Sequence, residues 1–164
     1  MIYKEKLSEL LKKKTIVSNE GLRLSFVNRG PATELEIENL SRTFDFRLPA
    51  EYLDFLLCYN GLELYKYEDV GGFEFFDASN LIEQNDSIRG DYDPVDWDSS
   101  IILFCRIIGE GNYLGFRIKN ENQYEVVDCF HESLPLEWVA IVTSFDYFLN
   151  RLIETGDEKF WLKE

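Results

Sequence analysis

His131 is the only histidine in the chain, and it lies close to Asp128 and Cys129, which raises the question of a metal site or a Cys–His pair. A zinc site needs three or four ligands, and the other cysteines, Cys58 and Cys105, are distant in sequence. A Cys–His nucleophile also needs a third group that orients the imidazole. The spacing completes neither site, so we expect a strand end that leads into a loop, with no catalytic residue, no metal and no cofactor.

Residues 109–112, Gly-Glu-Gly-Asn, superficially resemble a glycine-rich phosphate loop. The segment lacks the Lys-Ser/Thr that follows in such loops, and the residues after it predict a strand rather than a helix. Glycine and asparagine accept a positive φ, which tight turns between antiparallel strands require. We therefore expect Gly111 and Asn112 to close a hairpin.

Four aspartates, Asp91, Asp93, Asp96 and Asp98, fall in one short hydrophilic segment. Their spacing invites comparison with a calcium loop. An EF-hand needs a ligand at position 5 and glycine at position 6, whereas counting from Asp91 places Val95 and Asp96 there. Solvated carboxylates also make poor general acids at neutral pH. The segment therefore fits an exposed acidic loop.

The composition excludes several classes of protein. The 164 residues include 31 acidic and 17 basic ones, a formal net charge of −14. Such a surface repels phosphates, which argues against nucleic-acid binding and against docking on an anionic membrane. The sequence shows no export signal and no apolar run of the ~18 residues that a spanning helix needs. Its cysteines are odd in number and widely spaced. We therefore expect a cytoplasmic protein with reduced thiols.

Most of this charge lies in one quarter of the chain. Residues 60–100 contain eleven acidic and two basic residues, a net charge of −9. Such a run is usually a solvated face, but acids interleaved with aromatic residues also suit the capture of a basic partner, because charge steers the encounter and aromatic rings anchor it. The candidate partner-binding residues are Glu68, Asp69, Asp91, Tyr92, Asp93, Asp96, Trp97 and Asp98.

The apolar pattern predicts a single α+β domain, residues 1–164. Helices are expected at residues 2–14, at 31–44, from 48 to a stop at Asn60-Gly61, and from near Thr143 to Gly156. Strands are expected at residues 21–29, 73–76, 101–108, 113–119 and 124–127. Residues 78–87 suit either a short helix or a loop. The order predicts an antiparallel meander sheet packed with N-terminal and C-terminal helices.

Motifs spread over residues 31–153 point to a family. They are Pro31-Ala-Thr-Glu-Leu-Glu-Ile, Leu48-Pro49-Ala-Glu-Tyr52-Leu-Asp-Phe55-Leu with Asn60-Gly61, Gly109-Glu-Gly111-Asn112-Tyr-Leu-Gly115-Phe, Tyr124-Glu-Val-Val-Asp128 with His131, and Ser144-Phe145-Asp-Tyr-Phe148-Leu. In this order they resemble the SUKH superfamily, which includes bacterial immunity proteins of polymorphic toxin systems and fungal cell-wall synthesis regulators. Many members have a second glycine where this chain has Leu62. Residues 62–100 do not align with the family pattern, and we therefore expect them to be a variable acidic insert.

The resemblance implies a non-enzymatic cytoplasmic immunity protein that binds and neutralises a cognate toxin, a basic protein of the nuclease type, through its acidic surface. The alternative is a regulatory protein–protein interaction scaffold like the fungal members. The oligomeric state stays open. The motif residues have structural explanations in helix starts, turns and packing, and we expect that role for Pro49, Tyr52, Phe55, Asn60, Gly61, Gly111, Asn112, Asp128, Ser144, Phe145 and Phe148.

Overall fold

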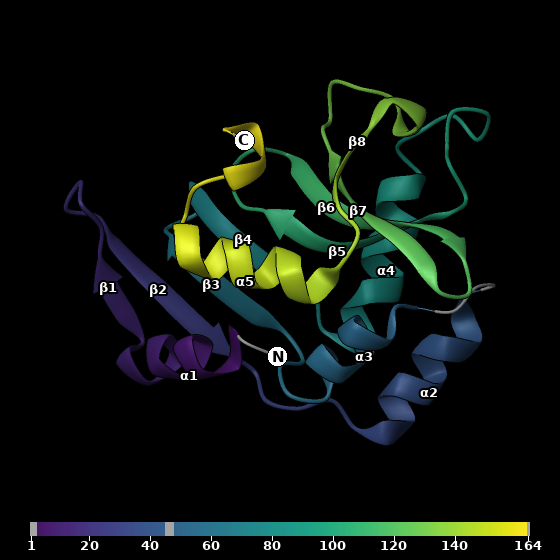
Figure 1. Ribbon diagram of the computed structural model, residues 1–164. Helices are drawn as coiled ribbons and strands as arrows, with labels where there is room; N and C mark the ends of the chain where they lie inside the picture. Colours follow the sequence, from purple (N-terminus) through teal and green to yellow (C-terminus); the bar gives the residue numbers. More distant parts are fainter. Residues whose placement is uncertain (1–2, 45–47, 164) are drawn as a thin grey trace.

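The computed structural model describes residues 3–44 and 48–163 (Figure 1). The strands are β1 (Thr15–Val17), β2 (Arg23–Asn28), β3 (Leu62–Tyr67), β4 (Gly71–Phe75), β5 (Ile101–Ile107), β6 (Asn112–Asn120), β7 (Gln123–Cys129) and β8 (Val139–Val142). The helices are α1 (Tyr3–Lys13), α2 (Glu34–Thr43), α3 (Ala50–Leu56), α4 (Ala78–Arg89) and α5 (Phe145–Thr155), with short 3₁₀ helices η1 (Pro135–Glu137) and η2 (Phe160–Leu162).

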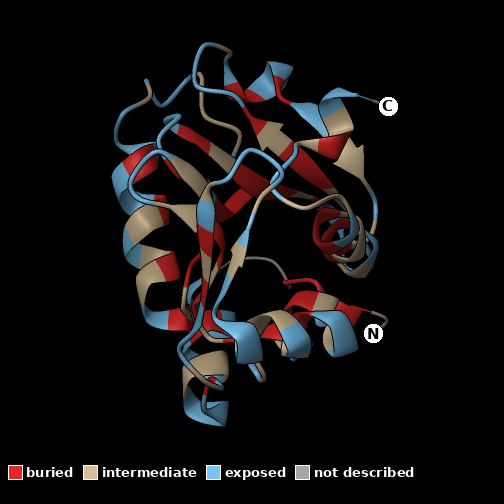
Figure 2. Cartoon of the chain, turned by 90° about the vertical axis from the view of Figure 1, so that its left-hand side faces the viewer, coloured by how far each residue is buried: buried red, intermediate tan, exposed pale blue. Residues whose placement is uncertain are grey.

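The strands form one sheet in which each strand pairs antiparallel with the next along the chain, from β1 at one edge to β8 at the other. The predicted α+β class, with a meander sheet packed against N-terminal and C-terminal helices, is confirmed. Figure 2 shows the two layers of helices, with α5 on one side of the sheet and α4 on the other. Each face of the middle strands is therefore covered by a different segment.

Stacked aromatic rings fill the core between α3, α5 and the sheet. The rings of Phe104 and Phe116 stack at a centroid distance of 4.4 Å, and Phe145 meets both edge-on at 5.5 and 5.8 Å. Tyr52 of α3 closes the cluster, 5.1 Å from Phe116. Such offset and edge-on geometries are the favourable ones for aromatic pairs, so the helices are fixed in position as well as buried.

Three of the helices begin at side chains that cap them. Thr33 and Glu36 form the reciprocal capping box that their spacing predicts, and Asp77 and Ser144 accept backbone N–H groups at the starts of α4 and α5. The ambiguous segment 78–87 is helical because Asp77 supplies this cap. The first predicted helix includes residue 2, which lies outside the described residues.

The second predicted helix begins three residues late, at Glu34, and the end of the third was wrong. The predicted third helix was to end at Asn60-Gly61, but α3 ends at Leu56. The amide oxygen of Asn60 instead accepts the N–H of Ala78 at 2.7 Å, which ties the connection before β3 to the start of α4. Gly61 has φ +94°, and a side chain there would press on Arg29 and Asp77. The pair therefore joins two elements rather than ending one.

The acidic segment 62–100 is an integral part of the sheet. It supplies β3, β4 and α4, of which only a short strand at 73–76 and an undecided helix at 78–87 were predicted. The strands β1 and β8 were not predicted either. Residues 90–100 connect the end of α4 to the start of β5 and form the loop at the upper right of Figure 1.

Candidate partner-binding site

Aromatic contacts hold the segment of residues 90–100 on the sheet, at the upper right of Figure 1. The rings of Tyr92 and Trp97 lie 5.5 Å apart, and Trp138, which precedes β8, packs against them at 5.9 and 6.0 Å. Trp138 is buried, and its indole N–H donates to the carbonyls of Phe130 and Ser133. Tyr92 and Trp97 are only partly buried, so they anchor the segment and still present ring surface to solvent.

Arg117 of β6 fixes the far end of the same segment. Its guanidinium donates to the carbonyls of Pro135 and Trp138, both at 3.0 Å. It also pairs with Asp98 at 3.4 Å and with Glu125 at 3.5 Å. Asp98 in turn accepts from the backbone N–H and hydroxyl of Ser100. One arginine thus joins residues 90–100, β7 and the segment before β8.

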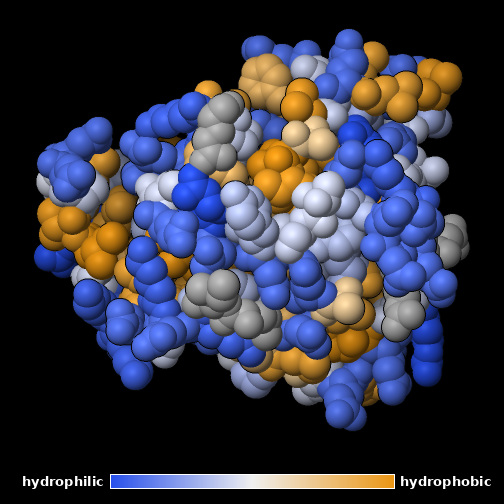
Figure 3. Space-filling view, viewed as in Figure 1, coloured by the Kyte–Doolittle hydropathy of each residue, from blue (hydrophilic) through white to orange (hydrophobic). Residues whose placement is uncertain are grey.

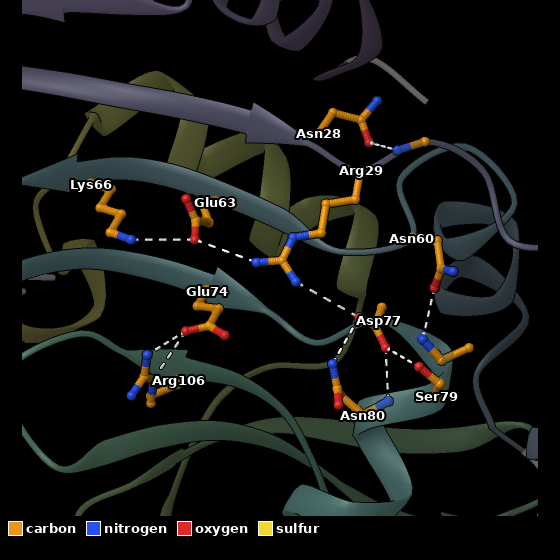
Figure 4. Close-up of polar contacts among 12 residues, drawn as sticks. Asn28, Arg29, Asn60, Glu63, Lys66, Glu74, Asp77, Ser79, Asn80 and Arg106 are labelled. Atoms are coloured by element: carbon orange, nitrogen blue, oxygen red, sulfur yellow. Dashed lines mark hydrogen bonds and ion pairs between the residues drawn. The ribbon is translucent and has the colours of Figure 1, made fainter.

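Further acids of the segment 60–100 are neutralised on the same face of the sheet. Figure 4 shows Arg29 between Glu63 and Asp77, at 3.7 and 3.8 Å, and Arg106 bonded to Glu74 across the β4–β5 pair. On α4, Asp86 pairs with Arg89. Together with Asp98, five of the eleven acids of the segment are therefore engaged in ion pairs.

The remaining six acids make no ion pair among the described residues. They are Glu68, Asp69, Glu83, Asp91, Asp93 and Asp96, all but the partly buried Asp96 exposed. Five of them belong to the predicted partner-binding set. Asp98 is the one acid of that set that pairs with an arginine among the described residues, so it differs from the other carboxylates in being neutralised.

The candidate residues do not form one surface. Glu68 and Asp69 lie in the turn between β3 and β4, beside Gly109, where a Cβ would meet the Val70 carbonyl oxygen at 2.3 Å. This turn is at the left of Figure 1, well away from residues 90–100. Asp91, Asp93 and Asp96, with the rings of Tyr92 and Trp97, make up what we call the acidic loop.

Sequence reasoning missed the two residues that hold this loop, Arg117 and Trp138. A signal for Arg117 was present, since it is a charged residue between the apolar residues Phe116 and Ile118 of a predicted strand. Nothing in the sequence pairs Trp138 with Tyr92, because the two meet only after β5, β6 and β7 have folded back on one another.

The residues at the end of β7 are held by burial and by hydrogen bonds to β6. Cys129 is buried, and burial raises the pKa of its thiol well above the ordinary value. The side chain of His131 lies 2.7 Å from the amide oxygen of Asn112, which also accepts its backbone N–H. The described residues contain no group of three or more His, Cys, Asp or Glu side chains that could hold a metal ion. Asn112 thus does more than close a hairpin, because it ties the β7 end to β6.

The family-motif residues surround a second polar cluster. Glu51 of α3 accepts from the Tyr124 hydroxyl at 2.6 Å, the Ser144 hydroxyl at 3.1 Å and the Asp146 backbone N–H at 3.1 Å. Burial alone would raise the pKa of Glu51, but these hydrogen bonds outweigh it and hold the pKa below its ordinary value. The carboxylate therefore joins α3 to the positive N-terminus of α5.

A model of the SMI1 / KNR4 family (SUKH-1) matches residues 31–151 of the chain. The match includes the acidic loop, Arg117, Trp138 and the Glu51 cluster. Comparison with curated proteins gives no match. No helix among the described residues is long and apolar enough to cross a membrane.

Proposed function

Since the chain belongs to the SMI1 / KNR4 family (SUKH-1), we propose that it works by binding another protein and not by catalysis. Within that family, an immunity role or a regulatory role of the SMI1 / KNR4 kind is supported. We propose the first: the protein binds a cognate toxin in the cytoplasm and blocks it. The toxin would be a basic protein of the nuclease type, whose substrate-binding surface attracts phosphates.

The observation that carries this proposal is the state of the acidic loop. Three exposed or partly exposed carboxylates, those of Asp91, Asp93 and Asp96, make no ion pair among the described residues, although nearby acids are paired. Fixed negative charges beside the partly exposed rings of Tyr92 and Trp97 match what a basic protein surface needs for fast, oriented association. Carboxylates in such an array also resemble a row of phosphates to a nuclease.

The test is co-purification with the product of the adjacent gene, followed by an inhibition assay. In the variant Asp91→Asn/Asp93→Asn/Asp96→Asn, binding should weaken by about tenfold or more, because each aspartate adds to steering and contact. Asparagine keeps the shape and the acceptor oxygen of each side chain. The matched control, Glu5→Gln/Glu9→Gln/Glu20→Gln, removes the same charge from exposed positions on other elements and should bind within about twofold of the wild type.

Two results would contradict the proposal. If both triple variants weaken binding equally, only net charge matters and the loop is not the site. If the adjacent gene encodes no toxin and its product does not bind even at low salt, the immunity role fails. A eukaryotic source, with binding to a signalling protein instead, would favour the regulatory scaffold.

A further inference from the structure

A groove runs beside β8, the last strand of the sheet. Its volume is about 620 Å³ and its walls are mainly apolar. One wall is formed by β8 and the loop before it, and the other by η2. Figure 3 shows hydrophobic atoms gathered in the upper middle of this face, between the C-terminal segment and the loop that carries η1. A groove of this size can receive several side chains of an extended chain.

The groove lies along a free sheet edge. Among the described strands none pairs with the outer side of β8. Val139 of this strand is 70% exposed, although valine is usually buried in a sheet. Two more large apolar side chains that line the groove are exposed, Phe130 and Leu162, and Leu134 and Leu136 are exposed in the segment before β8. Unpaired backbone groups beside apolar side chains are what an added strand requires.

One polar atom in the groove wall lacks a partner. Asp128 of β7 pairs in register with Val139, so both side chains lie on the groove face. Its Oδ2 accepts the indole N–H of Trp161 at 2.8 Å, while its Oδ1 is buried without a hydrogen-bond partner among the described residues. Two other charged side chains line the groove: Lys159 is bound to Glu110, and Glu137 accepts the backbone N–H of Leu134. Asp128 Oδ1 therefore lacks a hydrogen-bond donor, and a cationic side chain would be the strongest one.

We propose that an extended basic segment of a partner protein adds a strand to β8 and brings a lysine or arginine to Asp128. A second copy of this chain is a poor occupant, because each copy carries a net charge of −14. The buried Trp138 connects the two sites, since it lines the groove and packs against Tyr92 and Trp97 of the acidic loop. The inference goes beyond the proposed function, since it assigns a second surface and a backbone-based mode of recognition.

The test uses the full chain and a library of random nonapeptides displayed on phage. Selected peptides should alternate apolar residues and contain a lysine or arginine. Their affinity, measured by fluorescence anisotropy, should fall by about tenfold in Val139→Arg, because the new cation repels a basic strand and covers the edge. Val17→Arg is the matched control, since Val17 is 68% exposed on β1 at the opposite edge of the sheet.

Asp128→Asn adds a second criterion. It should weaken a selected peptide that contains lysine by about fivefold or more and leave the same peptide with norleucine at that position unchanged, because only the charge pair is lost. Equal loss in Val139→Arg and Val17→Arg, or selected peptides without a basic residue, would overturn the proposal. So would a dimer in analytical ultracentrifugation that Val139→Arg dissociates, which would give the groove to a second copy. The acidic-loop triple variant should still bind the peptides, so failure of the toxin experiment leaves this result intact.

Discussion

Arg117 shows how much of the site depends on a single side chain. Its side chain is 18% exposed, and its guanidinium contacts two carbonyls and two carboxylates. In Arg117→Met the two carbonyls lose this donor, while Asp98 keeps Ser100 and Glu125 keeps Lys119. We expect the free energy of unfolding to fall by roughly 2–3 kcal/mol, as for a partly buried charged network. Urea denaturation measures this change.

Arg106→Met is the control for that measurement. Arg106 is 48% exposed and, among the described residues, forms an ion pair with Glu74 alone, so its loss should cost about 1 kcal/mol or less. A cost for Arg117→Met no larger than that for Arg106→Met would show that the acidic loop does not depend on this arginine.

Glu51 predicts a pH dependence of stability. Because its pKa is lowered in the folded state, its contribution is present at neutral pH and is lost as the pH falls through the folded pKa. We expect Glu51→Gln to lower the free energy of unfolding at pH 7 by about 1–2 kcal/mol, given its partial exposure. The difference from the wild type should shrink in acid, as followed by urea denaturation between pH 7 and pH 3.

The neighbouring Asp146 gives a control of opposite sign. Burial, and then the charge of Glu51, raise the pKa of Asp146. Ionisation of Asp146 therefore lowers the free energy of unfolding, and this decrease sets in as the pH rises through the pKa of Asp146 in the folded state. Asp146→Asn should stabilise the protein at pH 7 and have no such effect in acid. Destabilisation by both variants at pH 7 would mean that helix capping, not ionisation, decides their effect.

At the scale of elements, most helices and the order of the strands could be predicted from the sequence, because their signals are local. Thr33 and Glu36 lie three residues apart, and the helix they cap is where the spacing places it. The strand β3 escaped prediction because Tyr65, at φ +52°, interrupts its alternation next to a shift in register. The strand β8 has four residues, too few for a pattern. Arg117 and Trp138 meet through strand pairing, which no local signal encodes.

The contact between two turns gives an element-scale prediction. Gly109 and Gly21 both have φ +83°, but a Cβ on Gly109 would lie 2.3 Å from the Val70 carbonyl oxygen, whereas one on Gly21 meets nothing within 4 Å. Gly21→Ala should cost about 1 kcal/mol from backbone strain alone. Gly109→Ala should cost about 2 kcal/mol more, because the β3–β4 turn must move away. Equal costs in urea denaturation would mean that the two turns are not in firm contact.

At the scale of the whole molecule, the acidic residues behind the net charge of −14 include paired and unpaired ones. Acids such as Glu63, Glu74 and Asp77 are balanced by arginines on the sheet. The three aspartates of the acidic loop lie close together without a cation among the described residues. Like charges so arranged repel one another, and this lowers the stability of the folded protein. A chain under selection for stability alone would gain by losing them.

The variant Asp91→Asn/Asp93→Asn/Asp96→Asn should therefore change stability and binding in opposite directions. Its free energy of unfolding at low salt should equal the wild-type value or exceed it by about 0.5–1 kcal/mol, since repulsion is relieved. Added salt should raise the unfolding midpoint of the wild type more than that of the variant. In the wild type salt screens the repulsion among the three aspartates, whereas the substitutions have already removed that repulsion from the variant. If the variant instead unfolds more easily and binds less, its loss of binding is a folding defect. A variant that is at least as stable as the wild type and binds its partner more weakly is the result expected of charges that are kept for recognition.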